Sequence, residues 1–384
     1  IDVRLHRPVA IGVPVTATAT VKEKRAETST VLLDCRAVNP AGEEVATGSV
    51  EVLAPREKMR HELLDLPKVQ LRRDNRYLDL LRACEGLPAL GCAVVHPCSA
   101  DALRGAVEAA EHHLITPILI GPEDKIRAIA AQEHLDLTPY RLVPTEHSHH
   151  SAELAVAMVL SGEAQTLMKG SLHTDELLAE VVKKVGGLRT ERRISHCFLL
   201  SVPNFPRPII ITDAAINIVP TLEVKRDIIQ NAIDLAHAIG IAEPKVAILS
   251  AVETVTNKIP STLEAGALCK MADRGQIVGG LLDGPLAFDN AIDEGAARTK
   301  GIVSPVAGKA DILVVPDMEA GNMLAKQLTC MAGAEAAGIV LGARAPIVLT
   351  SRADSAQTRL ASCAVAVLFA EAQRKGAALL KTGG

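Results

Sequence analysis

The chain has 384 residues, of which 48% are hydrophobic and 22% are charged, so it has enough apolar material for two packed α/β domains. Its formal net charge of −4 argues against a nucleic-acid partner, because binding to a phosphate backbone needs a concentrated excess of lysine and arginine. Aromatic residues are only 2% of the chain, so aliphatic side chains must fill the core, as is usual for helix-covered parallel sheets. No apolar run reaches the length of a membrane span, and no membrane partner is expected.

The eight cysteines are scattered along the chain, with no CxxC pair and no His/Cys cluster at metal-ligand spacing. We therefore expect reduced thiols, a cytoplasmic location and no metal site. His147, His149 and His150 are interpreted as the polar start of a helix rather than as ligands. The sequence begins at Ile1 without a methionine, so an upstream segment is expected.

Residues 1–55 are predicted to form a small β segment. The stretches 13–24, 28–39 and 44–53 are rich in valine and threonine, partly alternate in polarity and are separated by turn signals. Three strands cannot cover their own apolar face, so this segment either docks elsewhere or is part of a larger domain. Residues 56–76 are dense in charge and are predicted to be a linker.

From Tyr77 onward, strands and helices alternate. Residues 91–96 and 116–121 are predicted strands, and the amphipathic segment 100–113 between them is a predicted helix. Further predicted strands lie at 165–169, 195–202, 208–212, 245–250, 277–282, 311–316 and 347–350. This alternation favours a mostly parallel sheet covered by helices.

The number of predicted strands is too large for one compact sheet, so we expect two α/β/α domains with a cleft between them. Pro203 and Pro206 break the periodicity and mark a boundary. Domain I is predicted to comprise residues 77–200 and 341–384, and domain II residues 201–340.

Polar side chains follow two of the predicted strands, where open α/β sheets bind their ligands. These side chains are Asp317, Gly321 and Asn322 after one strand, and Ser351, Arg352 and Asp354 after the other. Two such strand ends suggest one cleft. The alternative is that the aspartate, asparagine and serine residues only cap the helices that follow.

Four long motifs occur in the order LMKGSLHT, GPLAFDNAI, SPVAGKADILVVPDMEAGN and MAGAEAAGIVLGARAPIVLTSRADS, at 167–174, 284–292, 304–322 and 331–355. From about Tyr77 to the C-terminus, the chain resembles the phosphate acetyltransferase/phosphate butyryltransferase family. The first fifty residues resemble the second half of a MaoC-like hotdog domain of enoyl-CoA hydratases. The whole is therefore similar to a bifunctional enoyl-CoA hydratase/phosphate acetyltransferase truncated at its N-terminus. The hydratase catalytic pair would lie in the missing half, so no hydratase activity is expected.

The resemblance implies a fold of the isocitrate/isopropylmalate dehydrogenase type and transfer of an acyl group between CoA and phosphate in a ternary complex. CoA and acyl-CoA would be substrates, with no bound cofactor. The implied catalytic residues are Ser351, Arg352 and Asp354, with Asp354 as the base for the CoA thiol. The implied substrate-binding residues are Ser304, Asp317, Gly321, Asn322, Lys169, Gly170, Ser171, His173 and Thr174. A homodimer or higher homo-oligomer is expected, and the Ala- and Gly-rich segment 331–343, taken as a helix, could pack closely in it.

The chain departs from the better-known acetyltransferase pattern at three places. Thr358 occupies the position of an aspartate seven residues beyond Ser351, Ala214 replaces a cysteine, and the helix that begins at Asp175 lacks an arginine. These differences favour the phosphobutyryltransferase-like branch. The arginines that could supply the missing cation are Arg189, Arg192 and Arg193.

Two other classes of function remain open. A CoA or acyl-phosphate binding protein without activity would also fit the missing arginine and aspartate. A dehydrogenase is disfavoured because no GxGxxG motif follows a strand, although related folds house such enzymes.

Overall fold

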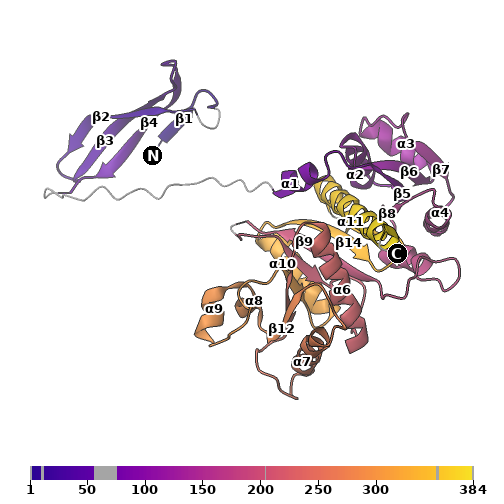
Figure 1. Cartoon of the computed structure of the whole chain (residues 1–384). Coiled ribbons are helices and arrows are strands. Elements are labelled where there is room, and N and C mark those ends of the chain that lie inside the picture. The colour runs from indigo at the N-terminus through magenta and orange to yellow at the C-terminus, as the bar shows by residue number, and fades with distance from the viewer. Residues whose placement is uncertain (1, 10–12, 56–75, 204, 352–353, 383–384) are drawn as a thin grey trace. The chain divides into compact units, whose positions relative to one another are not determined.

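The computed structural model describes the chain except residues 1, 10–12, 56–75, 204, 352–353 and 383–384 (Figure 1). It has two compact units, Ile1–Arg73 and Asp74–Gly384. Nearly all of the predicted linker 56–76 lies outside the described residues, and helix α1 (Arg76–Ala83) begins at its end. None of the described helices combines the length and apolar character that crossing a bilayer requires.

The N-terminal unit is an antiparallel sheet of order β1-β4-β3-β2. Its strands are β1 (Asp2–Leu5), β2 (Thr16–Arg25), β3 (Thr30–Val38) and β4 (Glu44–Leu53). The three predicted strands are confirmed to within a few residues at each end. The sequence analysis missed β1, which is only four residues long.

The register of this sheet separates its residues into an apolar and a polar face. Small side chains align in rows across the strands, Ala19 with Cys35 and Gly48, and Ala17 with Ala37 and Ala46. Threonine and charged residues occupy the alternate positions. Among the described residues of this unit, Val45 is the only buried hydrophobic side chain. A sheet with one uncovered apolar face has little core of its own.

The second unit is built on one eleven-stranded sheet of order β12-β11-β13-β10-β9-β14-β15-β8-β5-β6-β7. In chain order the strands are β5 (Leu90–Val95), β6 (Ile115–Gly121), β7 (Arg141–Pro144), β8 (Thr166–Lys169), β9 (Ser195–Ser201), β10 (Ile209–Thr212), β11 (Lys245–Leu249), β12 (Leu281–Leu286), β13 (Ile312–Val314), β14 (Glu335–Leu341) and β15 (Ile347–Val348). Most neighbours are parallel, as predicted. The antiparallel pairs β10–β9, β9–β14 and β14–β15 lie in the middle.

The sheet differs from the sequence prediction in two respects. Two separate sheets were expected, but β9 and β14 join all strands into one. The segment 331–343, expected as a helix, is helical only at Met331, the last residue of α10. From Glu335 to Leu341 it forms β14, which pairs along its whole length with β9 and buries Ile339, Val340 and Leu341. Alanine favours a helix, but the pairing of β14 with β9 and the burial of its apolar run override this preference. The division of this unit into two domains stays a prediction.

Helices cover both faces of the sheet. One face carries α2 (Ala100–Glu111), α3 (Glu123–Gln132), α6 (Leu222–Ala238), α7 (Pro260–Asp273) and α11 (Ala356–Thr382), packed in one large cluster of buried residues. The other face has a cluster under α4 (Ser148–Ser161) and α5 (Thr174–Val181). A further cluster there lies under α8 (Phe288–Ile292), α9 (Glu294–Thr299) and α10 (Met318–Met331). Figure 1 shows α11, in yellow, beside α2 and β14, so the C-terminal helix spans the middle of the sheet.

Candidate functional site

A tight turn follows β15 at Ser351. The backbone N–H of Ser351 donates to Asp354 Oδ2 at 2.6 Å, and the N–H of Asp354 donates back to the Ser351 carbonyl at 3.2 Å. Ser351 is exposed, whereas Thr350 before it is only 2% exposed. The structure therefore presents the Ser351 side chain at the end of a buried strand. Arg352, the predicted catalytic cation, lies outside the described residues.

Arg359 in α11 supports this turn through hydrogen bonds. Its side chain is fully buried, and its two terminal nitrogens donate to Thr350 Oγ1 at 2.6 Å, to the Ser351 carbonyl at 2.9 Å and to the Lys169 carbonyl at 3.4 Å. Gly105 in α2 makes room for it, since a Cβ there would lie 2.7 Å from Arg359 Cδ. Arg359 thus ties the first turn of α11 to the ends of β15 and β8. The sequence analysis missed this residue, whose only signal is an arginine on an otherwise apolar helix face.

The predicted Lys169–Thr174 turn lies beside this point. Lys169 is 2% exposed, and its ammonium group lies 3.4 Å from the Thr350 carbonyl and 3.5 Å from the Gly170 carbonyl. Gly170 donates to the Val95 carbonyl at 2.9 Å, and a Cβ at this position would come within 2.4 Å of that oxygen. The hydroxyl of Ser171 donates to the His96 carbonyl at 2.9 Å. The ends of β5, β8 and β15 therefore meet around Lys169.

His173 and Thr174 start helix α5. The N–H of His173 donates to Glu176 Oε1 at 3.4 Å, and the Ser148 hydroxyl also bonds to the Glu176 carboxylate. The hydrogen bond from Ser148 lowers the pKa of Glu176, and the backbone N–H of His173 contributes in the same direction. His173 therefore has a local structural role, and Thr174 is the first residue of the helix. A role in substrate binding stays a prediction.

Asp354 has an unusual electrostatic environment. Burial raises its pKa above the ordinary aspartate value. The hydrogen bond from Ser351 and the positive charges of Arg359, Lys169 and Lys326 oppose this shift only in part. Asp354 is therefore a carboxyl group that takes up a proton more readily than an exposed aspartate.

The predicted residues Asp317, Gly321 and Asn322 form a second group, which supports the loop after β10. Asp317 caps α10 by accepting from the Ala320 N–H at 2.8 Å, and Asn322 donates to the Ala214 carbonyl at 3.2 Å. Gly321 allows close approach, because a Cβ there would lie 3.0 Å from the Asp213 carbonyl oxygen.

Asp213, at the base of that loop, is buried and accepts from the backbone N–H groups of Ala215, Ile216 and Asn217. Ser304 lies before β13 and accepts from the N–H groups of Val306 and Ala307, at 3.0 and 3.1 Å. Its side chain thus closes a local turn.

The directions of the strands place the residues around Ser351 and those around Asp317 at different ends of the sheet. Thr212 is level with Val348 across β9 and β14, through the pairs Thr212–Cys197, Cys197–Ile339 and Ile339–Val348. Because β10 and β15 run in opposite directions, Asp213 and Ser351 leave the sheet at opposite ends of its strands. The structure brings Ser351, Asp354 and Lys169 together directly, whereas a single cleft that also includes Asp317 and Asn322 stays a prediction.

The three arginines proposed as replacement cations line a cavity of about 400 Å³ near the loop after β10. Arg226 and Asn217 also line this cavity, as do the acidic residues Glu191, Glu223 and Asp227. Arg192 is ion-paired with Asp234, and Arg226 with Asp227 at 2.8 Å. Among the described residues, no three His, Cys, Asp or Glu side chains are placed to hold a metal ion.

The chain is similar to known proteins in family, sequence and structure. A family model described as phosphate acetyl/butaryl transferase matches residues 145–367. Phosphate acetyltransferase of Rhizobium meliloti is 63% identical over 300 residues, which is 78% of this chain and 95% of that protein. Phosphate butyryltransferase of Clostridium acetobutylicum is 43% identical over 268 residues, 70% of this chain and 89% of that protein. The crystal structure of a branched-chain phosphotransacylase from Enterococcus faecalis V583 is similar with a TM-score of 0.65 and 29% identity, over 73% of this chain and 99% of that one.

Proposed function

Because the chain belongs to the phosphate acetyl/butyryl transferase family, we propose that it transfers an acyl group between CoA and inorganic phosphate. In this reaction a phosphate oxygen attacks the thioester carbonyl carbon, the carbon–sulfur bond breaks, and CoA leaves as a thiolate that then takes a proton. The reverse reaction gives acyl-CoA and phosphate from acyl phosphate and CoA. CoA is a substrate here and not a resident cofactor.

The observation that best supports this function is the set of hydrogen bonds that Ser351 makes with Asp354 and Arg359. Attack on a thioester places negative charge on the carbonyl oxygen, and a fixed donor nearby lowers the barrier. We assign that donor to the Ser351 hydroxyl, which is exposed at the end of β15 on a turn held by Arg359. In this proposal the Ser351 hydroxyl donates a hydrogen bond to the carbonyl oxygen of the thioester and does not attack the carbonyl carbon. The acyl group therefore passes directly between CoA and phosphate in a ternary complex.

Asp354 is the proposed base for the CoA thiol in the reverse direction. A thiol has an ordinary pKa of about 8.5, so a carboxylate must lie close and be more basic than usual to draw its proton. Burial raises the pKa of Asp354 in the required direction. The proton passes from sulfur to a carboxylate oxygen as the sulfur attacks the acyl carbon.

Cations must hold the phosphate groups. Lys169 lies under the Ser351 turn, and Arg352 follows it in sequence, so both are proposed to attract the reacting phosphate. The Arg189, Arg192 and Arg193 cavity is proposed as a second source of positive charge, for phosphates elsewhere on CoA. The remaining predicted binding residues are proposed to line the same cleft when the two lobes of the second unit close on it.

Three further proposals concern assembly, location and the N-terminal unit. Self-association as a homodimer or larger oligomer is supported by the apolar side chains of Met323 and Met331, which are 66% and 81% exposed on α10. A cytoplasmic location is supported by the cysteines, all eight of which are free. The N-terminal unit is proposed to be part of a hotdog domain, on the basis of its antiparallel sheet.

The test is an assay with acyl-CoAs from acetyl to hexanoyl and inorganic phosphate, in which free thiol and acyl phosphate are followed together. We expect equal amounts of both products. Ser351→Ala should lower turnover by about 10²-fold or more, the cost of removing an oxyanion donor, with little change in CoA affinity. Ser161→Ala, an exposed serine at the end of α4, is the matched control and should behave as the wild type. CoA binding without turnover of any acyl-CoA would contradict the enzyme and leave a CoA-binding protein.

A further inference from the structure

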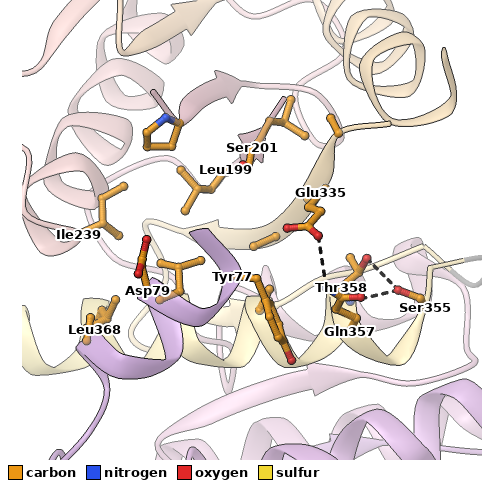
Figure 2. Close-up of a pocket in the computed structure, with 18 residues that line it drawn as sticks. Tyr77, Asp79, Leu199, Ser201, Ile239, Glu335, Ser355, Gln357, Thr358 and Leu368 are labelled. Atoms are coloured by element: carbon orange, nitrogen blue, oxygen red, sulfur yellow. Dashed lines mark hydrogen bonds between the residues drawn. The ribbon is translucent and has the colours of Figure 1, made fainter. Parts of the chain in front are cut away.

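A large, mostly apolar cavity lies beside the first turn of α11, and none of the proposed catalytic residues lines it. Its volume is about 500 Å³, within the range of small-molecule sites. It lies between α1, α11 and the strands β9 and β14 (Figure 2). The apolar side chains around it include Leu80, Leu199, Ile239, Ala361 and Leu368.

One end of the cavity is polar. Ser355, Gln357 and Thr358 lie there on the first turn of α11, and Gln357 bonds to Glu335 at 3.4 Å (Figure 2). The hydroxyl of Ser355 accepts from the Thr358 N–H at 3.2 Å, which fixes the start of the helix. The cavity thus has one hydrogen-bonded end and mostly apolar walls, with the carboxylate of Asp79 near Ile239 and Leu368 (Figure 2).

The polar end of the cavity is close to the Ser351 turn in the chain. Ser355, which lines the cavity, is four residues beyond Ser351, and Arg359, on the same turn of α11 as Gln357 and Thr358, donates to the Ser351 carbonyl at 2.9 Å. From Thr358 to Leu368 the helix advances about 15 Å, at about 1.5 Å per residue. Thr358 and Leu368 both line the cavity, so it has the length to hold an extended apolar chain along α11.

We propose that this cavity binds the acyl chain of the acyl-CoA substrate, and that it accepts chains longer than butyryl. The inference rests on the proposed acyl transfer. Two acidic side chains, Asp79 and Glu335, line the cavity, so it repels the phosphates of CoA and the inorganic phosphate. An uncharged alkyl chain suits it, because each buried methylene gains free energy whereas a buried charge without a partner costs much more.

The test measures inhibition by S-alkyl-CoA thioethers with ethyl, butyl, hexyl and octyl chains. For the wild type, we expect the inhibition constant to fall by up to about fourfold for each added methylene, the full transfer value for a buried methylene. Ala361→Phe fills the middle of the cavity and should abolish the gain beyond the butyl chain. Leu368→Ala enlarges the far end and should improve the octyl compound relative to the hexyl compound.

The matched control for Ala361→Phe is Ala372→Phe, the same substitution on the same helix at a residue that does not line the cavity. This variant should keep the wild-type dependence of inhibition on chain length. If Ala361→Phe does not fold, Ile239→Phe narrows the cavity from the other side. Equal inhibition by all four thioethers, or an unchanged chain dependence in the filled variants, would overturn the assignment. Turnover of acetyl-CoA with no chain dependence would overturn only the cavity proposal, whereas no turnover of any acyl-CoA would overturn the proposed function itself.

Discussion

Arg359 has three acceptors, and together they set the geometry of the Ser351 turn. A lysine at this position keeps the charge but cannot reach all three, because its single nitrogen lacks the planar fork of a guanidinium. We expect Arg359→Lys to lower kcat by about 10- to 100-fold, since displacements near 1 Å at a reacting group have effects of this size. The KM for acyl-CoA should change much less.

The measurement is steady-state kinetics together with the thermal midpoint of both proteins. Arg127→Lys is a suitable control, because Arg127 forms an exposed ion pair with Glu123 on α3. A kcat for Arg359→Lys equal to that of the wild type would show that the turn does not depend on Arg359.

Asp354 should determine the acid side of the pH profile. A base must be deprotonated to act, so activity from acyl phosphate and CoA falls as pH decreases through its pKa. Because burial raises this pKa, the fall is expected above the range of ordinary aspartates. Asp354→Asn keeps an acceptor for the Ser351 N–H but should lower the rate by about 10²- to 10⁴-fold and remove this limb of the profile. An unchanged acid limb in the variant would assign the titration to another group.

His196 is a buried side chain that lowers the stability of the fold at acidic pH, and no proposed catalytic step uses it. It lies in β9 with no exposed surface, and its ring nitrogens make no hydrogen bond of good geometry. Burial lowers its pKa to about 4, and the backbone of Leu349 opposes this shift only weakly. The unfolded chain takes up a proton near pH 6.5, so the folded state loses stability as pH falls from about 6.5 to 4.

Replacement by an apolar side chain removes this linkage. The free energy of unfolding of His196→Leu should therefore fall less than that of the wild type over the same interval, by about 3 kcal/mol. Urea denaturation at pH 7, 5.5 and 4 gives both curves. Parallel curves for the two proteins would mean that His196 is not buried in its neutral form.

At the scale of elements, the sequence predicts strands well where an apolar run is short and bounded by turn signals. β4 is predicted at its observed bounds, and β5, β6, β9 and β11 to within one or two residues. β12 begins at Leu281 and not at 277, because the glycines at 279 and 280 precede the pairing with β11. Periodicity alone also cannot give strand direction, which depends on pairing between segments far apart in sequence.

The candidate site is predictable only in part, for the same reason. Ser351, Asp354 and Lys169 are identified from motifs that follow strands, and the structure places them together. Arg359 and Gly105 could not be identified, because their relation is a contact between two helices that are distant in the chain. Whether Asp317 and Ser351 lie in the same cleft depends on the directions of the strands in the sheet, and these cannot be read from the sequence.

At the scale of the whole molecule, every group assigned to acyl transfer belongs to the second unit, Asp74–Gly384. The N-terminal unit has one buried hydrophobic side chain among its described residues, whereas the clusters under both faces of the large sheet involve residues of the second unit. Removal of residues 1–73 should therefore leave kcat, KM and the main thermal transition unchanged within about twofold and about 2 °C, the range expected when no large contact is lost.

The same assay of thiol and acyl phosphate, combined with calorimetry, compares the shortened and full-length proteins. A deletion of the second unit's own α1, by starting the chain at residue 85, is the contrasting variant. It removes Tyr77 and Leu80, which pack against the main core, and should lower the thermal midpoint. If removal of residues 1–73 alone lowers kcat, the N-terminal unit takes part in catalysis, and the assignment of all catalytic groups to the second unit is wrong.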